Sequence, residues 1–186
     1  MSIGYKFIKS AEGSCNGNFV GIGADCCANA SVWVDDADPW GISIVNGEFT
    51  SFSGPFGPDV ADHTQIVVTG SNSGAVRFVS SAFWGPSNQI ARLNGTGSVG
   101  FESCLFNTWD PKKNGTAAIQ VYGGDVLVRG SDFQTAHPGG QVLLGAGSGK
   151  AVIAHNLFKG AQNITNLGAG PSLIKDNLPD APAQAD

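Results

Sequence analysis

The sequence predicts an all-β protein, a parallel β-solenoid of about six to seven coils. Two observations lead to this prediction. Short runs of Val, Ile and Phe alternate with small polar residues between Gly, Asn and Ser punctuation, and no stretch keeps a helical apolar period. One phrase also recurs along the chain, as AVRFVSSAFWGP, SVGFESCLFNTW, DVLVRGSDFQTA and KAVIAHNLFKGA. Repeated units that cannot bury an apolar face alone bury it by stacking.

The repeats align on a phenylalanine that ends each phrase. This column contains Phe49, Phe83, Phe106, Phe133, Phe158 and Pro179. Five residues earlier stand Ile44, Phe78, Phe101, Val128, Ile153 and Ile174, and seven earlier stand Ile42, Val76, Val99, Val126, Ala151 and Ser172. Because residues two apart share one face of a strand, the two earlier columns predict a buried face. A β-sandwich is disfavoured, since its strands do not repeat one side-chain type in register.

Two further columns are polar. Two residues before the phenylalanines lie Gly47, Ser81, Cys104, Ser131, Asn156 and Asn177. Small and amide residues here predict a tight turn, with left-handed backbone angles and side chains hydrogen-bonded between coils. A second apolar ladder contains Ile66, Ile90, Ile119, Val142 and Ile164, and the residues before four of its anchors predict an outward polar row: Gln65, Gln89, Gln141 and Asn163.

Length and composition favour one domain, the β-helix of residues 1–178, and the Pro- and Ala-rich residues 179–186 predict a disordered tail or a linker. Charged residues make up only 13% of the chain and the formal net charge is −5, so neither nucleic acid nor an anionic membrane is an expected partner. No apolar run is long enough to span a bilayer. The cysteines leave two readings open: a bridge from Cys15 to Cys26 or Cys27, or free thiols.

The phrases VRFVSSAFWGPSNQIARLNGTGSVGFESCLFNTWD and VLVRGSDFQ…AVIAHNLFKG resemble the right-handed parallel β-helix of the pectate-lyase superfamily, especially bacterial proteins related to glycoside hydrolase family 28. The resemblance covers most of the chain but only the later coils of such proteins. It therefore implies a part of a longer solenoid, with further coils or a second copy as partners. It also implies a polysaccharide partner and an extracellular or periplasmic location, although the N-terminus lacks a signal-peptide apolar stretch.

The resemblance also directs attention to candidate catalytic residues. Asp35 and Asp36, with Asp38, form the densest carboxylate cluster, which suits hydrolysis or calcium binding; the alternative is ordinary turn chemistry before a proline. Lyases of this fold use a basic residue, and Arg129 shares a predicted outward column with Glu102 and Lys175. Asp110 and His137 complete the catalytic candidates: Asp35, Asp36, Asp110, Arg129 and His137. The hydrolase runs of the family, Asn-Thr-Asp and Gly-His-Gly, are absent. The sequence identifies no cofactor with certainty, and calcium is the one candidate.

Aromatic residues provide a second set of candidates. Sugars stack their C–H faces on flat rings while their hydroxyls bond amides and carboxylates. The predicted carbohydrate-binding residues are Trp40, Trp84, Asn107, Trp109 and Gln134. The alternative for the tryptophans is packing against the solenoid flank. Three functions stay open: part of a polysaccharide lyase or glycoside hydrolase, a carbohydrate-binding module without chemistry, and a structural or tailspike-like stalk.

Overall fold

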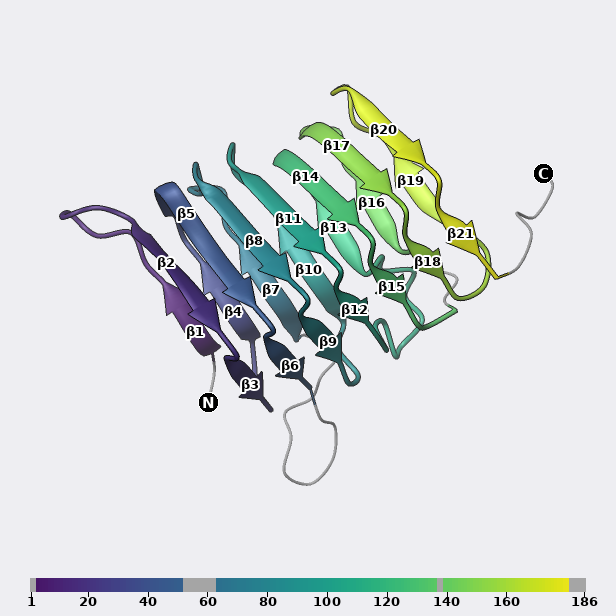
Figure 1. Ribbon diagram of the computed structural model, residues 1–186, viewed down its shortest axis with the longest axis horizontal. Coiled ribbons are helices and arrows are strands. Elements are labelled where there is room, and N and C mark those ends of the chain that lie inside the picture. Colours follow the sequence, from purple (N-terminus) through teal and green to yellow (C-terminus); the bar gives the residue numbers. More distant parts are fainter. Residues whose placement is uncertain (1–2, 52–62, 137–138, 181–186) are drawn as a thin grey trace.

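A computed structural model describes residues 3–51, 63–136 and 139–180, and these residues form 21 strands and no helix. The strands build three parallel sheets of seven strands each, and every turn of the chain contributes one strand to each sheet. The protein is thus a β-solenoid of about seven turns, as the repeat predicts. Figure 1 shows the turns side by side in chain order along one axis.

The three sheets are named in the order in which the chain visits them. The first sheet contains β1 (Ile3–Phe7), β4 (Ala30–Val34), β7 (Thr64–Val68), β10 (Gln89–Leu93), β13 (Ile119–Val121), β16 (Val142–Leu144) and β19 (Ile164–Asn166). The second contains β2 (Cys15–Val20), β5 (Ala37–Val45), β8 (Ala75–Val79), β11 (Ser98–Glu102), β14 (Gly124–Arg129), β17 (Ser148–Ala154) and β20 (Ser172–Lys175). The third contains β3 (Gly23–Asp25), β6 (Glu48–Thr50), β9 (Ala82–Trp84), β12 (Leu105–Phe106), β15 (Asp132–Phe133), β18 (Leu157–Phe158) and β21 (Leu178–Pro179).

The predicted apolar columns are confirmed by the strand register. In the third sheet the phenylalanine column runs from Phe49 through Phe83, Phe106, Phe133 and Phe158 to Pro179. The rings of Phe49 and Phe83 stack with centroids 5.3 Å apart, and Phe78 and Phe101 of the second sheet stack at 5.3 Å. Rings from the two sheets meet edge to face, as Phe78 does with Phe83 at 5.5 Å. Such contacts add about 1 kcal/mol each to the burial of the rings.

The corner between the second and third sheets is built the same way in every turn. One residue there has a positive φ, in the order Gly21 (65°), Asn46 (54°), Ser80 (49°), Ser103 (55°), Gly130 (60°), His155 (58°) and Asp176 (54°). The left-handed position is therefore one residue before the predicted column. The predicted column itself points inward and forms the expected ladder. The Ser131 amide, for example, donates to Asn156 Oδ1 at 3.0 Å, and the Asn156 amide donates to Asn177 Oδ1 at 3.1 Å.

The second predicted ladder is right in four anchors and wrong in one. Ala91, and not Ile90, pairs with Ile66 and Ile119, because the amides of residues 90 and 91 both bond to Ala118 O and shift the register by one residue. The polar row before this ladder is outward at Asn163, which is exposed, and inward at its other three members. Its three glutamines are buried, and each donates its amide to a backbone carbonyl of the corner that leads into the first sheet; they are Gln65, Gln89 and Gln141.

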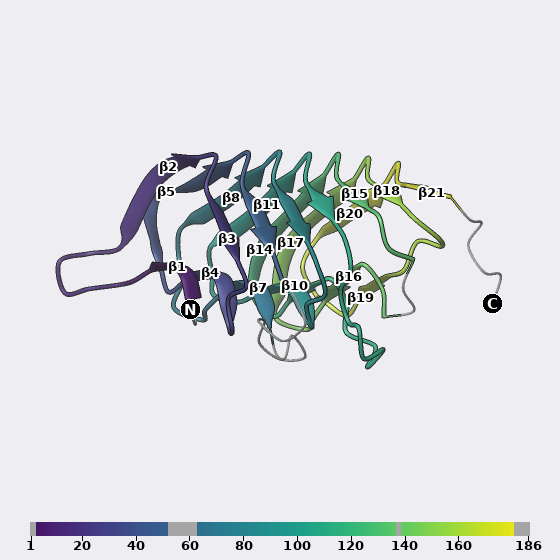
Figure 2. The ribbon, with the colours of Figure 1, turned by 90° about the horizontal axis from the view of Figure 1, so that it is seen from below.

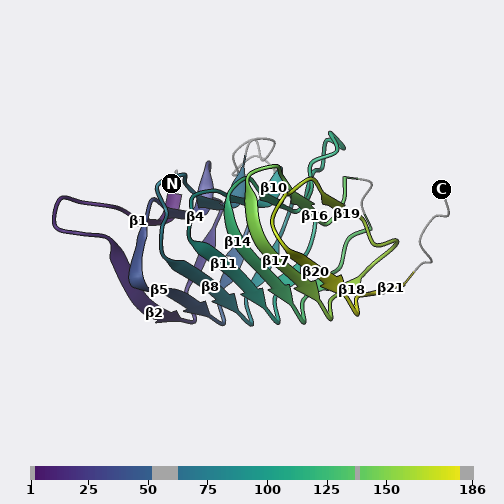
Figure 3. The same cartoon turned by 90° about the horizontal axis from the view of Figure 1, so that it is seen from above.

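The two ends of the stack differ. The loop from β1 to β2 projects from one end, as Figure 2 shows, while β19, β20 and β21 form the last turn at the other end, where Figure 3 shows them beside β16, β17 and β18. Leucines of the last turn are exposed, with Leu178 at 67% and Leu173 at 47%. Between the two ends the apolar interior is continuous, since Phe49, Phe83, Phe106 and Phe133 are all fully buried.

Candidate functional site

The three aspartates of the acidic cluster point to different partners. Asp35 accepts a hydrogen bond from Trp33 Nε1 at 2.7 Å, and Asp38 accepts one from the backbone amide of Trp40 at 2.8 Å. Asp36 turns into the interior, where 2% of its surface is exposed. The side chains do not converge, so the cluster lacks the grouped oxygens that a calcium ion requires.

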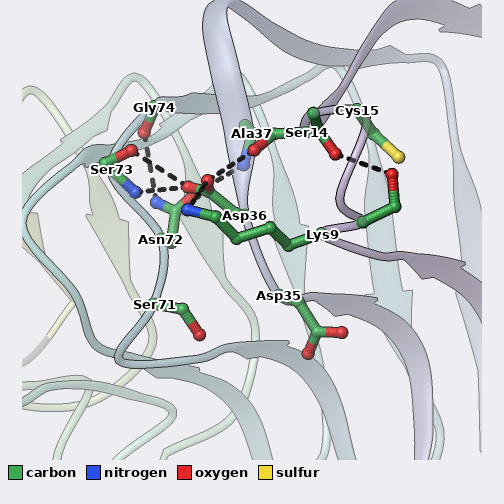
Figure 4. A network of polar contacts seen from close by, with 12 residues as sticks. Lys9, Ser14, Cys15, Asp35, Asp36, Ala37, Ser71, Asn72, Ser73 and Gly74 are labelled. Atoms are coloured by element: carbon green, nitrogen blue, oxygen red, sulfur yellow. Dashed lines mark hydrogen bonds and ion pairs between the residues drawn. The ribbon is translucent and has the colours of Figure 1, made fainter.

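Asp36 holds two loops onto the second sheet (Figure 4). Lys9 Nζ lies 2.9 Å from Asp36 Oδ2, which also accepts the Ser14 hydroxyl, while Oδ1 accepts the Ser73 amide at 2.7 Å and the Ser73 hydroxyl at 3.1 Å. Burial by itself raises the pKa of the Asp36 carboxyl, but these hydrogen bonds outweigh burial and hold the pKa well below its ordinary value. A carboxylate so firmly ionised and so fully bonded is poorly suited to acid or base catalysis.

Asp110 is a second structural carboxylate. It is 1% exposed, with φ of 48°, and accepts hydrogen bonds from the backbone amides of Asn114, Gly115 and Thr116 at 2.8–3.0 Å. These bonds close the loop that follows β12. Asp110 therefore stabilises a turn. Because the residue is buried, its carboxylate does not face solvent, where a catalytic carboxylate would meet its substrate.

Arg129 is exposed on the second sheet and lies directly beside Glu102 in the predicted outward column, with Lys175 two strands further along. The layering of these charges is confirmed, whereas a catalytic role for Arg129 stays a prediction. His137 lies outside the described residues.

The predicted tryptophans separate into exposed and buried rings. Trp40 is 86% exposed and Trp84 is 37% exposed. Trp109 is only 1% exposed, and its ring meets Phe133 edge to face with centroids 6.3 Å apart. The expectation of an exposed Trp109 platform is therefore wrong: the loop after β12 folds this ring into the core, as the packing alternative describes.

The outward face of the third sheet brings together three of the predicted binding residues. Two columns run along this face, one on either side of the buried phenylalanines. The column after the phenylalanines contains Thr50, which is buried, followed by Trp84, Asn107, Gln134, Lys159 and Asp180. The column before them contains Glu48, Ala82, Leu105, Asp132, Leu157 and Leu178. Trp84, Asn107 and Gln134 thus lie on three consecutive turns, at the ends of β9, β12 and β15, and Figure 1 shows these three strands side by side.

An open groove of about 730 Å³ lies over this face at β12, β15, β18 and β21. It is lined by Asn107, Asp132, Gln134, Leu157, Phe158, Lys159, Leu178, Pro179 and Asp180. The leucines give it an apolar strip, since Leu157 is 50% exposed and Leu178 is 67% exposed. Polar and apolar groups therefore alternate along one surface.

The polar groups of the groove are held in fixed orientations. Asn107 Oδ1 accepts hydroxyl protons from Thr108 at 3.0 Å and Thr135 at 2.8 Å, which leaves its Nδ2 group as a donor toward the groove. Gln134 Nε2 donates to Asp132 Oδ2 at 2.9 Å, which leaves Gln134 Oε1 as an acceptor. Within the part of the chain that the structure describes, Lys159 Nζ makes no hydrogen bond or ion pair.

Sequence reasoning missed five residues of the groove that flank the phenylalanine column: Asp132, Leu157, Lys159, Leu178 and Asp180. The signal was available, because all five lie one residue to either side of the column that aligns the repeats. Extending the alignment to the flanking columns would have identified them. What the alignment does not give is the hydroxyl pair that orients Asn107, since Thr108 and Thr135 lie in loops of unequal length.

The cysteines do not form the site. All four are free thiols, so the disulfide reading is wrong. Burial raises the pKa of the Cys104 thiol to about 11, which keeps it protonated and unreactive. Among residues 3–51, 63–136 and 139–180, no three His, Cys, Asp or Glu side chains are grouped so that they could hold a metal ion.

No protein-family model matches this chain, and no curated protein or solved structure matches it significantly. The parallel solenoid is therefore shown by the structure alone, and the pectate-lyase resemblance rests on the repeated phrases. The described residues also contain no helix that could cross a membrane.

Proposed function

We propose that the protein is a carbohydrate-binding module of a pectate-lyase-like solenoid, and that it binds polysaccharide along the groove of the third sheet. The observation that supports this most is the combination, on one face, of fixed hydrogen-bond donors, fixed acceptors and an apolar strip. Sugar rings present the same combination, with hydroxyls at the edge and C–H groups on the faces.

The repeat of the solenoid suits a polymer. Neighbouring strands lie about 4.8 Å apart, so equivalent side chains return at that interval along the axis. The sugar units of an extended glycan return at a similar interval. Trp84, Asn107, Gln134 and Lys159 occupy one column on consecutive turns, and each would meet a successive unit of the chain.

The charges in the groove favour a neutral glycan. Asp132 and Asp180 each carry a negative charge, and Lys159 carries one positive charge. A uronate-rich chain would place carboxylates beside the two aspartates, and like charges at short range oppose binding. Xylan, mannan or β-glucan chains lack this penalty.

Binding without hydrolysis fits the same groove. Asp132 and Asp180 belong to turns two apart and to columns on opposite sides of the phenylalanines, so their backbone positions are offset by about 9.6 Å along the axis and roughly 6.6 Å along the strand. The combined separation of roughly 12 Å is beyond the separation of about 5–9.5 Å that glycosidase carboxylates use. Asp36 and Asp110 are occupied by structural hydrogen bonds. These distances and contacts support the binding module over the enzyme.

Affinity electrophoresis tests the proposal with xylan, mannan and mixed-linkage β-glucan, and with pectin and alginate as acidic polymers. We expect retardation by a neutral polymer and no release of reducing ends or unsaturated uronates. Gln134→Ala and Trp84→Ala should each weaken retention about fivefold, the effect of losing roughly 1 kcal/mol. Gln120→Ala, which removes the same amide from the first sheet, is the matched control. Unchanged retention in both Gln134→Ala, within the groove, and Trp84→Ala, on the turn beside it, or turnover of any polymer, would contradict the proposal.

A further inference from the structure

The outward face of the second sheet has a gap at one position. Its central column runs Ser43, Arg77, Gly100, Leu127, Val152 and Leu173, so Gly100 is the residue without a side chain in the middle of the face. No backbone constraint explains this glycine. Its φ is not positive, and a Cβ atom there would have only Arg77 Cγ within 4 Å, at 3.8 Å. A strand glycine without a conformational role often marks the close approach of a ligand.

The gap is a notch of about 280 Å³ with a mixed lining. Gly100, which is itself buried, lies on its floor, and Leu127 and Val152 provide apolar walls. Arg77, Asp125 and Lys150 stand around it. Small-molecule sites commonly combine an apolar body with a few polar groups in this way.

Two cations of the notch are free to bind. Arg77 and Lys150 are exposed, and neither side chain makes a hydrogen bond or ion pair with the residues that the structure describes. Asp125 is already engaged, since its Oδ1 accepts the Lys150 backbone amide at 2.7 Å. The notch therefore has two unpaired positive charges and one partly satisfied negative charge, in a chain whose formal net charge is −5.

We infer that this notch binds an organic carboxylate that carries an apolar face. The guanidinium of Arg77 would take the carboxylate, since a planar fork bonds both oxygens at once, and Lys150 would supply a second charge. The apolar face of the ligand would lie over Gly100, between Leu127 and Val152. Two sources share this chemistry: a uronic acid unit of a glycan and a free aromatic or aliphatic acid.

The test is a titration of the isotope-labelled protein followed by the backbone amide signals. Sodium galacturonate and sodium benzoate represent the two sources, and glucose is the neutral probe. We expect saturable shifts at Gly100 and Leu127 with at least one acid and none with glucose. Arg77→Gln should weaken binding about tenfold or more, and Gly100→Leu should abolish it by filling the notch.

Ser43→Leu is the matched control for the glycine variant, because it adds the same side chain to the same column two strands earlier. It should leave the shifts unchanged. Saturation by galacturonate alone assigns the uronate source, and saturation by benzoate alone assigns the free acid. No saturable shift with either acid, or full binding by Gly100→Leu, would overturn the inference. None of these readouts involves the groove of the third sheet.

Discussion

Buried polar side chains of this solenoid serve mainly as partners for backbone groups and loops. Asp36 joins the loop after β1 to the loop before β8, and Asp110 closes the loop after β12. In both residues, the carboxylate oxygens accept hydrogen bonds from donors of the protein. Carboxylates that sequence reasoning selects as candidate catalysts can therefore be structural, because the bonds that bury them also remove the free lone pairs that catalysis requires.

His63 predicts a pH-dependent stability. Its ring is fully buried, Nδ1 lies 2.6 Å from Ser51 Oγ, and burial lowers its pKa to about 4, below the ordinary value of 6.5. Between those values the unfolded chain binds the proton and the folded chain does not, so stability is fully present above pH 6.5 and is lost as pH falls toward 4. The loss should be up to about 3 kcal/mol, at roughly 1.4 kcal/mol per pH unit.

Urea denaturation at pH 7.5, 6, 5 and 4.5 measures this effect. His63→Asn keeps a side chain that can bond Ser51 but cannot gain a proton, so its stability should change less over the same range than that of the wild type. His155→Asn, at an exposed left-handed position that asparagine tolerates, should retain the wild-type slope. Equal slopes in all three proteins would show that His63 does not carry the pH dependence.

At the scale of the element, the corner between the second and third sheets depends on its inward ladder. Asn156 is fully buried; its Oδ1 accepts the Ser131 amide, and its Nδ2 donates to Val128 O at 3.0 Å and to Asn177 Oδ1 at 3.0 Å. One side chain thus satisfies backbone groups of the preceding turn. At this corner the hydrogen bonds of the ladder therefore connect each turn to the next.

Asn156→Ala should lower the free energy of unfolding by about 2–4 kcal/mol, because it leaves a buried amide and a buried carbonyl of the preceding turn without partners. Asn156→Ser should cost less, since Ser131 occupies the same ladder and its hydroxyl accepts the Cys104 amide at 3.1 Å. Asn166→Ala, at an exposed asparagine of β19, is the control. Urea denaturation compares the three. A loss for Asn156→Ala no larger than that of the control would show that the ladder does not stabilise the corner.

The sequence predicts the second and third sheets better than the first. Columns around Phe78 and Phe83 repeat at constant offsets, because a two-residue corner joins the two sheets and leaves the register no freedom. The first sheet follows loops of unequal length, so the repeat weakens there. Two adjacent apolar residues, such as Ile90 and Ala91, then fit the alignment equally well, and the sequence does not show which of them occupies the column. For the same reason, the sequence suggests that the buried glutamines lie on the surface.

The same difference between regular columns and irregular loops determines which residues of the candidate site can be predicted from the sequence. Trp84, Asn107 and Gln134 occupy a regular column, and the sequence places them together. Trp109 lies in a loop, where its direction depends on tertiary packing against Phe133 that no periodicity reports. Residues on the repeat can be positioned from sequence, and residues in the loops cannot.

At the scale of the whole molecule, the outward faces of the second and third sheets differ in charge. The groove over the third sheet combines Asp132, Lys159 and Asp180, whereas the notch over the second sheet combines Arg77 and Lys150 with Asp125. Parallel stacking allows the two faces to carry different charges, because outward and inward side chains alternate along each strand. The outward residues of each column can therefore change without a change in the core. A solenoid can thus present distinct binding surfaces without a change in its interior.

The stack also predicts a gradient of local stability along its axis. In a solenoid each turn contacts only its neighbours, so a turn whose side chains are mostly exposed opens more easily than a turn whose side chains are buried. Strands β19, β20 and β21 have mostly exposed side chains, whereas β10 is buried at four of its five residues. Hydrogen exchange followed by mass spectrometry should show amides of β20 exchanging about a hundredfold faster, relative to their intrinsic rates, than those of β11. Uniform protection across both strands would show instead that the stack opens as one unit, and that the contacts between turns exceed those that hold any single turn together.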